Sequence, residues 1–516
     1  MTEQTTTPDD QPLEDRGSNR SQRPTSQAFR EFIGANWGPR PDQLPQRMDS
    51  AGSAANNRAN IGAQFPGERL VVPAGQLVVR SNDTDYRFRP HSAFAHLTGL
   101  GTDQMPDAVL VLEPNQTDGG EPVTEGGTHT ATLYFRPRAE RDTEEFYADS
   151  RYGELWVGVR PSLEEVEAAT GITCAHIETF GDAVAKDAGQ VTVRVVPQAD
   201  EAITAVVRKA QQEAGVQAEA AQDALLAERL SELRLVKDAW EIGEMRKAVD
   251  ATKAGFEAMI RSLPRATEHP RGERVIEGAF AAVSREEGNG LGYETIAASG
   301  NNANTLHWIN NDGEVRPGDM VLIDAGVEVD SLYTADITRT IPVDGTFTEP
   351  QRKVYQAVLD AADASFARAQ EVREDGSRPR FRELHEAAME VLAHRLADWG
   401  MLPVSAEESL KPEGQYHRRW MVHGTSHHLG IDVHDCAQAR RDMYLDGELA
   451  EGMVFTIEPG LYFRADDLAV PEEMRGMAVR IEDDILVTPE GAERLSAHIP
   501  REAAEVEAWV QGLLAQ

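Results

Sequence analysis

Residues 421–435 read MVHGTSHHLGIDVHD and concentrate four histidines within twelve positions. They are His423, His427, His428 and His434. The whole chain of 516 residues contains fourteen histidines, so this segment is strongly enriched. Histidine is the commonest metal ligand among protein side chains and the one whose charge changes closest to neutral pH. Because a metal site needs several ligands, the acids of the surrounding sequence are the next residues to consider.

Four predicted strands in the second half of the chain carry an acid inside an apolar run. The acids are Asp324 in VLIDAG, Asp336 in TADITRT, Glu458 in FTIEPG and Glu482 in VRIEDD. A buried ionised carboxylate is costly unless it is paired or bound to a cation. Each acid taken singly is also explained by a salt bridge, for which Arg339 and Arg480 are available. Four acids in one region favour a shared cation.

Both pairs of acids have positions that would bring them together. Asp324 and Asp336 flank a turn-like segment at residues 330–331, so a hairpin would place them opposite each other. Glu458 and Glu482 lie on two later predicted strands that would pair likewise. With one histidine these acids form a ligand set for two oxygen-preferring divalent ions, not a thiolate zinc site. Two such ions can share a water and lower its pKa, which produces a nucleophile at neutral pH.

The composition excludes several functional classes. The chain has 51 Lys and Arg against 87 Asp and Glu, a net charge of −36 that disfavours binding to nucleic acid or anionic membranes. Its two cysteines, Cys174 and Cys436, exclude a disulfide framework and favour a reducing compartment. We find neither a signal-peptide pattern nor a run of about 18 apolar residues. We therefore expect a cytoplasmic protein that binds neither nucleic acid nor membrane.

The length and the sequence pattern predict two domains. Residues 1–27 are polar and acidic, which predicts a disordered tail, and residues 28–65 would form an arm. Residues 66–235 alternate short apolar strands with helices such as SLEEVEAATG, which predicts an α/β domain. Residues 236–516 mix helices and strands, so we expect an α+β domain with an antiparallel or mixed sheet. The boundary falls at a break in the helical pattern near residues 234–237.

Five motifs in fixed order carry a family resemblance. The series LIDAG, DITRT, HGTSHHLGIDVHD, IEPGLY and RIEDD resembles the pita-bread metallopeptidase family and, within it, aminopeptidase P, the Xaa-Pro aminopeptidase family. The similarity spans roughly residues 66–500 and is strongest in the second half. It implies a C-terminal pita-bread catalytic domain after a smaller α/β domain of the creatinase and aminopeptidase P N-terminal type. It also implies hydrolysis of the bond between an N-terminal residue and a proline in second position, by a metal-bridging hydroxide.

The resemblance implies roles for the acids and histidines. Two divalent ions, usually manganese, would be bound by Asp324, Asp336, His427, Glu458 and Glu482. The bridging ligands would be Asp336 and Glu482, and Glu458 would also accept the water proton and pass it toward the leaving nitrogen. Three further histidines match positions that bind substrate and stabilise the tetrahedral intermediate. They are His307, His423 and His434.

Other residues match the surroundings of the site. Tyr293, Tyr462 and Arg480 resemble residues of the substrate pocket, and Arg480 lies two positions before Glu482, so both would point to one side of a strand. His428 and Cys436 match no role and are expected in the core. Trp156 in ELWVG resembles a tryptophan that caps the pocket in relatives, with core packing as the alternative. In the family the first domain assists oligomer contacts, which implies a homodimer or homotetramer acting on peptide substrates.

Three rival functions remain open. Prolidase, which cleaves only Xaa-Pro dipeptides, is the nearest, although Ser426 before His427 favours aminopeptidase P. A non-catalytic pita-bread binding module would normally lack some of the five ligands that are present here. A scaffold that uses its acidic surface is the third.

One spacing departs from the family. Asp324 and Asp336 are twelve positions apart, whereas many relatives have eleven. An extra residue in the turn at residues 330–332 would leave both strands in place, whereas a bulge inside the strand would change the register of Asp336.

Overall fold

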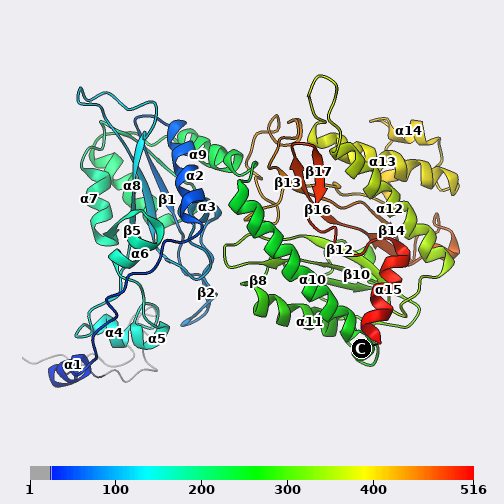
Figure 1. Cartoon of the computed structure of the whole chain (residues 1–516), viewed down its shortest axis with the longest axis horizontal. Coiled ribbons are helices and arrows are strands. Elements are labelled where there is room, and N and C mark those ends of the chain that lie inside the picture. The colour runs from blue at the N-terminus through cyan, green and yellow to red at the C-terminus, as the bar shows by residue number, and fades with distance from the viewer. Residues whose placement is uncertain (1–23, 25, 516) are drawn as a thin grey trace, which may run out of the picture. The chain divides into compact units, whose positions relative to one another are not determined.

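The computed structural model describes residue 24 and residues 26–515 (Figure 1). The predicted disorder of residues 1–27 falls almost entirely outside the described residues, and Gln27 is the first residue of helix α1 (Gln27–Gly34). Ser26 caps this helix because its side chain accepts a hydrogen bond from the Phe29 amide. The described chain divides into two compact units, residues up to 226 and residues from 227 onward. Helix α9 (Ala220–Leu233) contains the division, and the predicted break at residues 234–237 separates α9 from α10.

The first unit is built on a five-stranded mixed sheet with strand order β6-β5-β4-β1-β7. The strands are β1 (Glu68–Pro73), β4 (Val109–Pro114), β5 (His129–Phe135), β6 (Thr173–His176) and β7 (Thr192–Val195). A small hairpin pairs β2 (Val79–Ser81) with β3 (Thr84–Asp85). The helices are α2 (Ala51–Ala63), α3 (Ser92–Thr98), α4 (Glu144–Ala148), α5 (Glu154–Val157), α6 (Leu163–Thr170), α7 (Phe180–Ala185) and α8 (Glu201–Glu213). Strands that alternate with helices confirm the predicted α/β class.

The second unit combines several small antiparallel sheets with long helices. One sheet has the order β12-β10-β9, a second has β13-β16-β17, and two-stranded ladders join β14 to β15 and β11 to β8. The strands are β8 (Gly290–Leu291), β9 (Ile296–Ser299), β10 (Met320–Ala325), β11 (Val327–Glu328), β12 (Ile337–Pro342), β13 (Val454–Ile457), β14 (Gly460–Phe463), β15 (Met477–Arg480), β16 (Asp483–Thr488) and β17 (Gly491–Arg494). The expected antiparallel α+β domain is therefore present.

Long helices cover these sheets. They are α10 (Ala239–Thr267), α11 (Gly272–Glu287), α12 (Glu349–Ala369), α13 (Phe381–Asp398), α14 (Ala406–Leu410) and α15 (Ala503–Leu514). In Figure 1, α10 lies beside α11 and α15, and α12 lies beside α13. Helix α10 begins at a capping box. The Asp238 side chain accepts from the Trp240 and Glu241 amides, and the Glu241 side chain accepts from the Asp238 amide.

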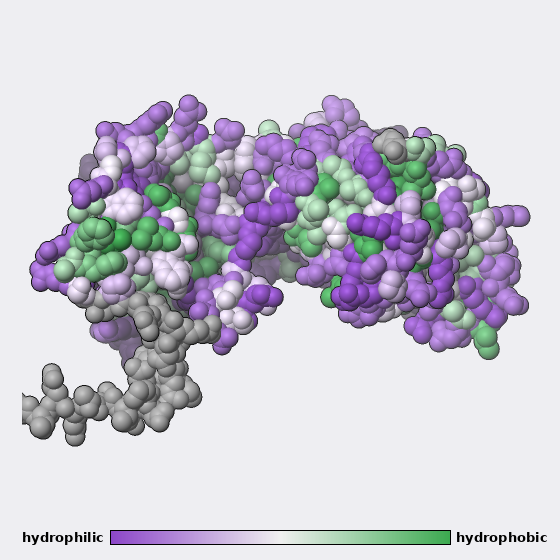
Figure 2. All heavy atoms as spheres, turned by 90° about the horizontal axis from the view of Figure 1, so that it is seen from below, coloured by the Kyte–Doolittle hydropathy of each residue, from purple (hydrophilic) through white to green (hydrophobic). Residues whose placement is uncertain are grey.

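The surface follows the composition. Figure 2 shows that hydrophilic side chains predominate on the face drawn, as a net charge of −36 leads one to expect. Cys174 and Cys436 are both free thiols, and Cys436 is fully buried in the core that contains Phe381 and Phe455, as predicted. Among the described residues, no helix combines the length and apolar content that crossing a membrane requires.

Candidate metal centre and active site

A cavity of about 560 Å³ opens in the second unit, and all five predicted metal ligands line it. The other predicted residues on its wall are Tyr293, His307, His423, His434 and Arg480. Tyr462 does not line the cavity itself, but its hydroxyl contacts two residues that do, His423 and Arg480. The structure therefore gathers in one place residues that are up to about 190 positions apart in the sequence.

The hairpin predicted around residues 330–331 positions the first two acids. Strands β10 and β12 pair in regular antiparallel register, with Asp324 opposite Thr338, so Asp336 lies just before the ladder. Leu332 has a φ of +75°, so the additional residue is accommodated in the turn and not by a bulge inside the strand. The Tyr293 hydroxyl lies 2.7 Å from Asp324 Oδ1 and also contacts Asp336 Oδ1, so its single proton can be donated to either acid.

The second pair of acids lies between two ladders that share one register. Ile457 pairs with Asp483, and Gly460 pairs with Arg480, so Glu458 and Glu482 face each other between these ladders. A single bridge joins Glu482 to Thr338 of β12. This bridge brings the second pair of acids against the first.

Three side chains form the tightest cluster of possible ligand atoms. Asp336, His427 and Glu482 each offer an atom within 4.8 Å of the others, and this is the one such group found in the described part of the chain. His427 Nε2 lies 3.3 Å from Asp336 Oδ2 and 3.8 Å from Glu458 Oε1. The other ring nitrogen, Nδ1, is 3.2 Å from the His428 carbonyl oxygen. A donor at Nδ1 leaves the Nε2 lone pair directed at the acids, as a metal ligand requires.

The electrostatics of the cluster call for a cation. Burial and the neighbouring carboxylates raise the pKa of Asp336 and of Glu458, the latter to about 8, and raise that of Glu482 well above its usual range. Burial opposes the charged form of His427, but the carboxylates of Asp336 and Glu458 outweigh it and raise its pKa to about 9. Neighbouring carboxylates disfavour each other's ionised form. A divalent ion bound between them removes this repulsion and favours the ionised form of each. A donor set of carboxylates and one imidazole fits such an ion.

Arg480 connects the ligands to the pocket wall. Its Nη2 lies 2.6 Å from Asp324 Oδ2, and its Nη1 donates to the Tyr462 hydroxyl at 3.0 Å. That hydroxyl is 2.7 Å from His423 Nε2. Arg339, the other cation available to the acids, instead pairs with Asp483 at 2.7 Å. Separate salt bridges therefore do not account for the four acids.

Two supporting residues escaped the sequence analysis. Thr338 donates to Glu482 Oε2 at 2.7 Å and accepts from Arg480 Nε at 3.2 Å. Both carboxylate oxygens of Asp484 lie 3.3 Å from the Asp336 amide, from which they accept. Each lies two positions after a predicted ligand, so strand alternation was a usable signal.

The remaining histidines separate by environment. The His434 ring is 4.5 Å from that of His427, and burial together with His427 and His307 lowers its pKa. His428 is fully buried and stacks on Phe381 at 4.5 Å, so it is a core residue, as expected. Trp156 is 54 % exposed, which excludes the core packing considered for it.

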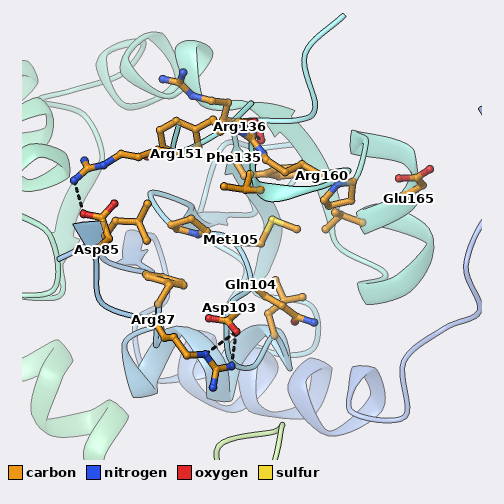
Figure 3. Close-up of a pocket in the computed structure, with 18 of the residues that line it drawn as sticks. Asp85, Arg87, Asp103, Gln104, Met105, Phe135, Arg136, Arg151, Arg160 and Glu165 are labelled. Atoms are coloured by element: carbon orange, nitrogen blue, oxygen red, sulfur yellow. Dashed lines mark hydrogen bonds and ion pairs between the residues drawn. The ribbon is translucent and has the colours of Figure 1, made fainter. Parts of the chain in front are cut away.

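The first unit contains a larger cavity, of about 1120 Å³, with a different character (Figure 3). Its charged side chains compensate one another: Arg151 lies 2.6 Å from Asp85, and Arg87 pairs with Asp103. Arg160 donates to the Pro137 carbonyl at 2.9 Å. Because the acids of the smaller cavity in the second unit lack such compensation, we assign the chemistry to that cavity.

Comparison with known proteins agrees with this assignment. Residues 243–489 match the model of metallopeptidase family M24, and residues 54–195 match the aminopeptidase P N-terminal domain. A Streptomyces coelicolor protein described as Xaa-Pro aminopeptidase 2 is 49 % identical over 90 % of this chain and 91 % of its own length. The Escherichia coli Xaa-Pro aminopeptidase is 32 % identical over 87 % and 95 %, respectively.

Solved structures give the same answer. Escherichia coli aminopeptidase P with the inhibitor Pro-Leu superimposes with a TM-score of 0.75 at 28 % identity, covering 91 % of this chain and all of that one. A zinc-substituted form in complex with product has a TM-score of 0.76 and covers 90 % and 99 %. The chain belongs to metallopeptidase family M24 and, within it, to the aminopeptidase P family.

Proposed function

We propose that the protein is a dinuclear-metal aminopeptidase that releases the N-terminal residue of peptides with proline in second position. The observation that carries this proposal is the convergence of four acids and one imidazole on one cavity. The family to which the chain belongs supports the reaction, since its relatives are described as Xaa-Pro aminopeptidases.

The ligand assignment extends from the cluster of Asp336, His427 and Glu482. Two divalent ions would be held by Asp324, Asp336, His427, Glu458 and Glu482. Manganese is the metal we propose, because the family resemblance implies it and carboxylate donors suit it. When bound, the two metal ions would lower the pKa of a water molecule and so supply the nucleophile.

The protein's own groups would move the proton. Glu458 lines the cavity beside His427, so its carboxylate is placed to accept a proton from the attacking water. His423 Nδ1 lies 3.6 Å from Glu458 Oε2, so the two side chains are neighbours on the cavity wall. From there Glu458 can return the proton to the proline nitrogen as it leaves.

The histidines on the wall would bind the peptide. His307, His423 and His434 line the same cavity as the ligands. Donors from these rings would bind the carbonyl oxygen preceding proline and stabilise its negative charge as the tetrahedral intermediate forms. The acids on the opposite side would attract the free amine of the substrate, which restricts cleavage to the first residue.

Two further properties belong to the proposal. The two free cysteines support the cytoplasmic location that we propose, because a reducing compartment keeps thiols free. The exposed Trp156, with Leu155 and Val157 beside it also about half exposed, supports contact with another copy of the chain in a homodimer or homotetramer.

Cleavage of matched peptides tests the function. With Mn²⁺ present, the purified protein should release the first residue of a tripeptide with proline second and leave the same tripeptide with alanine second intact. Hydrolysis of the Xaa-Pro dipeptide alone would instead identify a prolidase. If a sample containing two metal ions per chain hydrolyses neither the proline tripeptide nor the Xaa-Pro dipeptide, the result would favour a binding module.

A further inference from the structure

A buried carboxylate outside the metal cluster organises the loop that carries His307. Glu273 lies at the second position of helix α11 and is 0 % exposed. Its Oε1 accepts from the Ser299 amide at 2.8 Å and from Asn302 Nδ2 at 2.9 Å. Its Oε2 accepts from Trp308 Nε1 at 2.8 Å and from the Gly313 amide at 2.7 Å. Each oxygen therefore receives two donors.

This carboxylate has no cation to explain its burial. Among residue 24 and residues 26–515, the contacts of the Glu273 carboxylate are these four hydrogen bonds, and none comes from a Lys, Arg or His. An isolated buried carboxylate is expensive unless hydrogen bonds satisfy it. Four donors to one charged acceptor meet that requirement, and hydrogen bonds to a charged group are stronger than those between neutral groups.

The four donors lie on both sides of His307 in the sequence. Ser299 and Asn302 precede it, and Trp308 and Gly313 follow it. The segment 299–313 has little regular structure beyond a short 3-10 turn at Gly300–Asn304. His307 itself is exposed on the wall of the active-site cavity. The position of its ring therefore depends on how firmly the loop is held at its two ends.

The space around the carboxylate is also fitted to it. A Cβ added at Gly313 would lie 2.7 Å from Glu273 Oε2 and 2.4 Å from Asn302 Nδ2. The Glu273 amide in turn donates to the Gly313 carbonyl at 3.2 Å. The loop thus closes on Glu273 through backbone and side-chain contacts together.

We propose that Glu273 is a positioning residue for the aminopeptidase reaction, acting through His307. The inference rests on the proposed function, because it assigns Glu273 to the substrate-binding side of that site. In Glu273→Gln the volume is kept, but whichever way the amide turns, its NH₂ group faces two donors. At least two buried N–H groups then lose their acceptor, and the loop must shift.

A double-mutant cycle tests the inference on the intact protein loaded with Mn²⁺. Glu273→Gln should lower kcat/KM for the proline tripeptide by about tenfold or more, because small displacements of positioning groups are costly. In the His307→Ala background the same change should cost less than about twofold, since the group through which Glu273 acts is gone. Metal content should stay at the wild-type level in every variant.

Two variants complete the design. Trp308→Phe removes one of the four donors and should give a smaller loss in kcat/KM, which keeps the test available if Glu273→Gln does not fold. Glu287→Gln changes an exposed acid at the last position of the same helix and should leave kcat/KM unchanged.

The outcomes separate the two proposals. A wild-type protein that cleaves no Xaa-Pro peptide overturns the proposed function. An active wild type in which Glu273→Gln costs the same factor with and without His307 overturns the positioning role and leaves a structural one. Full activity in Glu273→Gln or in His307→Ala overturns it as well.

Discussion

Asp336 is the residue on which most of the site's contacts meet. Its Oδ2 lies 3.3 Å from His427 Nε2, and its other carboxylate oxygen contacts the Tyr293 hydroxyl. It also belongs to the tightest cluster of possible metal ligands, with His427 and Glu482. Asp336→Asn should lower kcat by more than about 100-fold, because loss of partners outside the ligand shell already costs 10–100-fold. Steady-state kinetics with metal analysis would measure this. Asp330→Asn, in the exposed turn nearby, is the matched control and should be neutral; comparable activity in both variants would refute the ligand assignment.

His427 and Glu458 make metal binding depend on pH. Carboxylates around His427 raise its pKa to about 9, and burial raises that of Glu458 to about 8. A metal ion must displace these protons, so affinity for Mn²⁺ should rise with pH and level off above about 9. Calorimetry of the metal-free protein in buffers of different ionisation enthalpy would detect the released protons. Affinity that is constant between pH 6 and 9 would contradict this account.

The sequence pattern indicated the proposed ligands but not the residues that support them. An acid in an apolar strand is conspicuous because it needs compensation, and this signal found Asp324, Asp336, Glu458 and Glu482. Glu273 gave no comparable signal, because its four partners come from a loop whose path depends on tertiary contacts. Local pattern shows that a charge must be satisfied, but the partner is set by the fold.

At the scale of elements, hydrophobic pattern and capping signals were sufficient for individual helices and strands. SLEEVEAATG forms α6, which begins at the capping box of Ser162 with Glu165 and ends at Gly171 with a φ of +72°. Pairing was predicted between the strands of Asp324 and Asp336, which a turn joins, and between those of Glu458 and Glu482. The bridge from β12 to Glu482 links segments more than 140 residues apart, and no local pattern specifies such a contact.

Residues 234–237, which follow α9, contact the histidine-rich segment 421–435 through the buried acid Asp435. Asp435 is 1 % exposed; Arg234 Nε lies 2.8 Å from its Oδ1, and Lys237 Nζ lies 3.8 Å from its Oδ2. Asp435→Asn would remove the buried charge that Arg234 and Lys237 share, and we expect a loss of about 3–5 kcal/mol in unfolding free energy. Urea denaturation would measure it. Asp432→Asn, whose side chain is 35 % exposed and 3.8 Å from Arg234, should cost less than about 1 kcal/mol.

The ion pairs of Asp435 also predict how the free energy of unfolding falls at low pH. Burial opposes ionisation of Asp435, but Arg234 and Lys237 outweigh it and lower its pKa below 3.8. A lowered folded-state pKa means that this contribution is complete above pH 3.8 and is lost as pH falls through the lowered value. Asp435→Asn should therefore flatten the fall in stability below that pH. An unchanged acid limb in the variant would mean that other carboxylates govern it.

At the scale of the whole molecule, metal binding should stabilise the protein through the second unit. The predicted ligands all belong to residues from 227 onward, and their carboxylates repel one another until a cation joins them. An ion at 100 times its dissociation constant adds about 2.7 kcal/mol to the folded state. For a unit that spans residues 227–516 this raises Tm by roughly 4–5 °C. Scanning calorimetry with and without Mn²⁺ would measure the shift, and Asp336→Asn should abolish it. A shift of equal size in that variant would trace the effect to general screening of the net charge of −36.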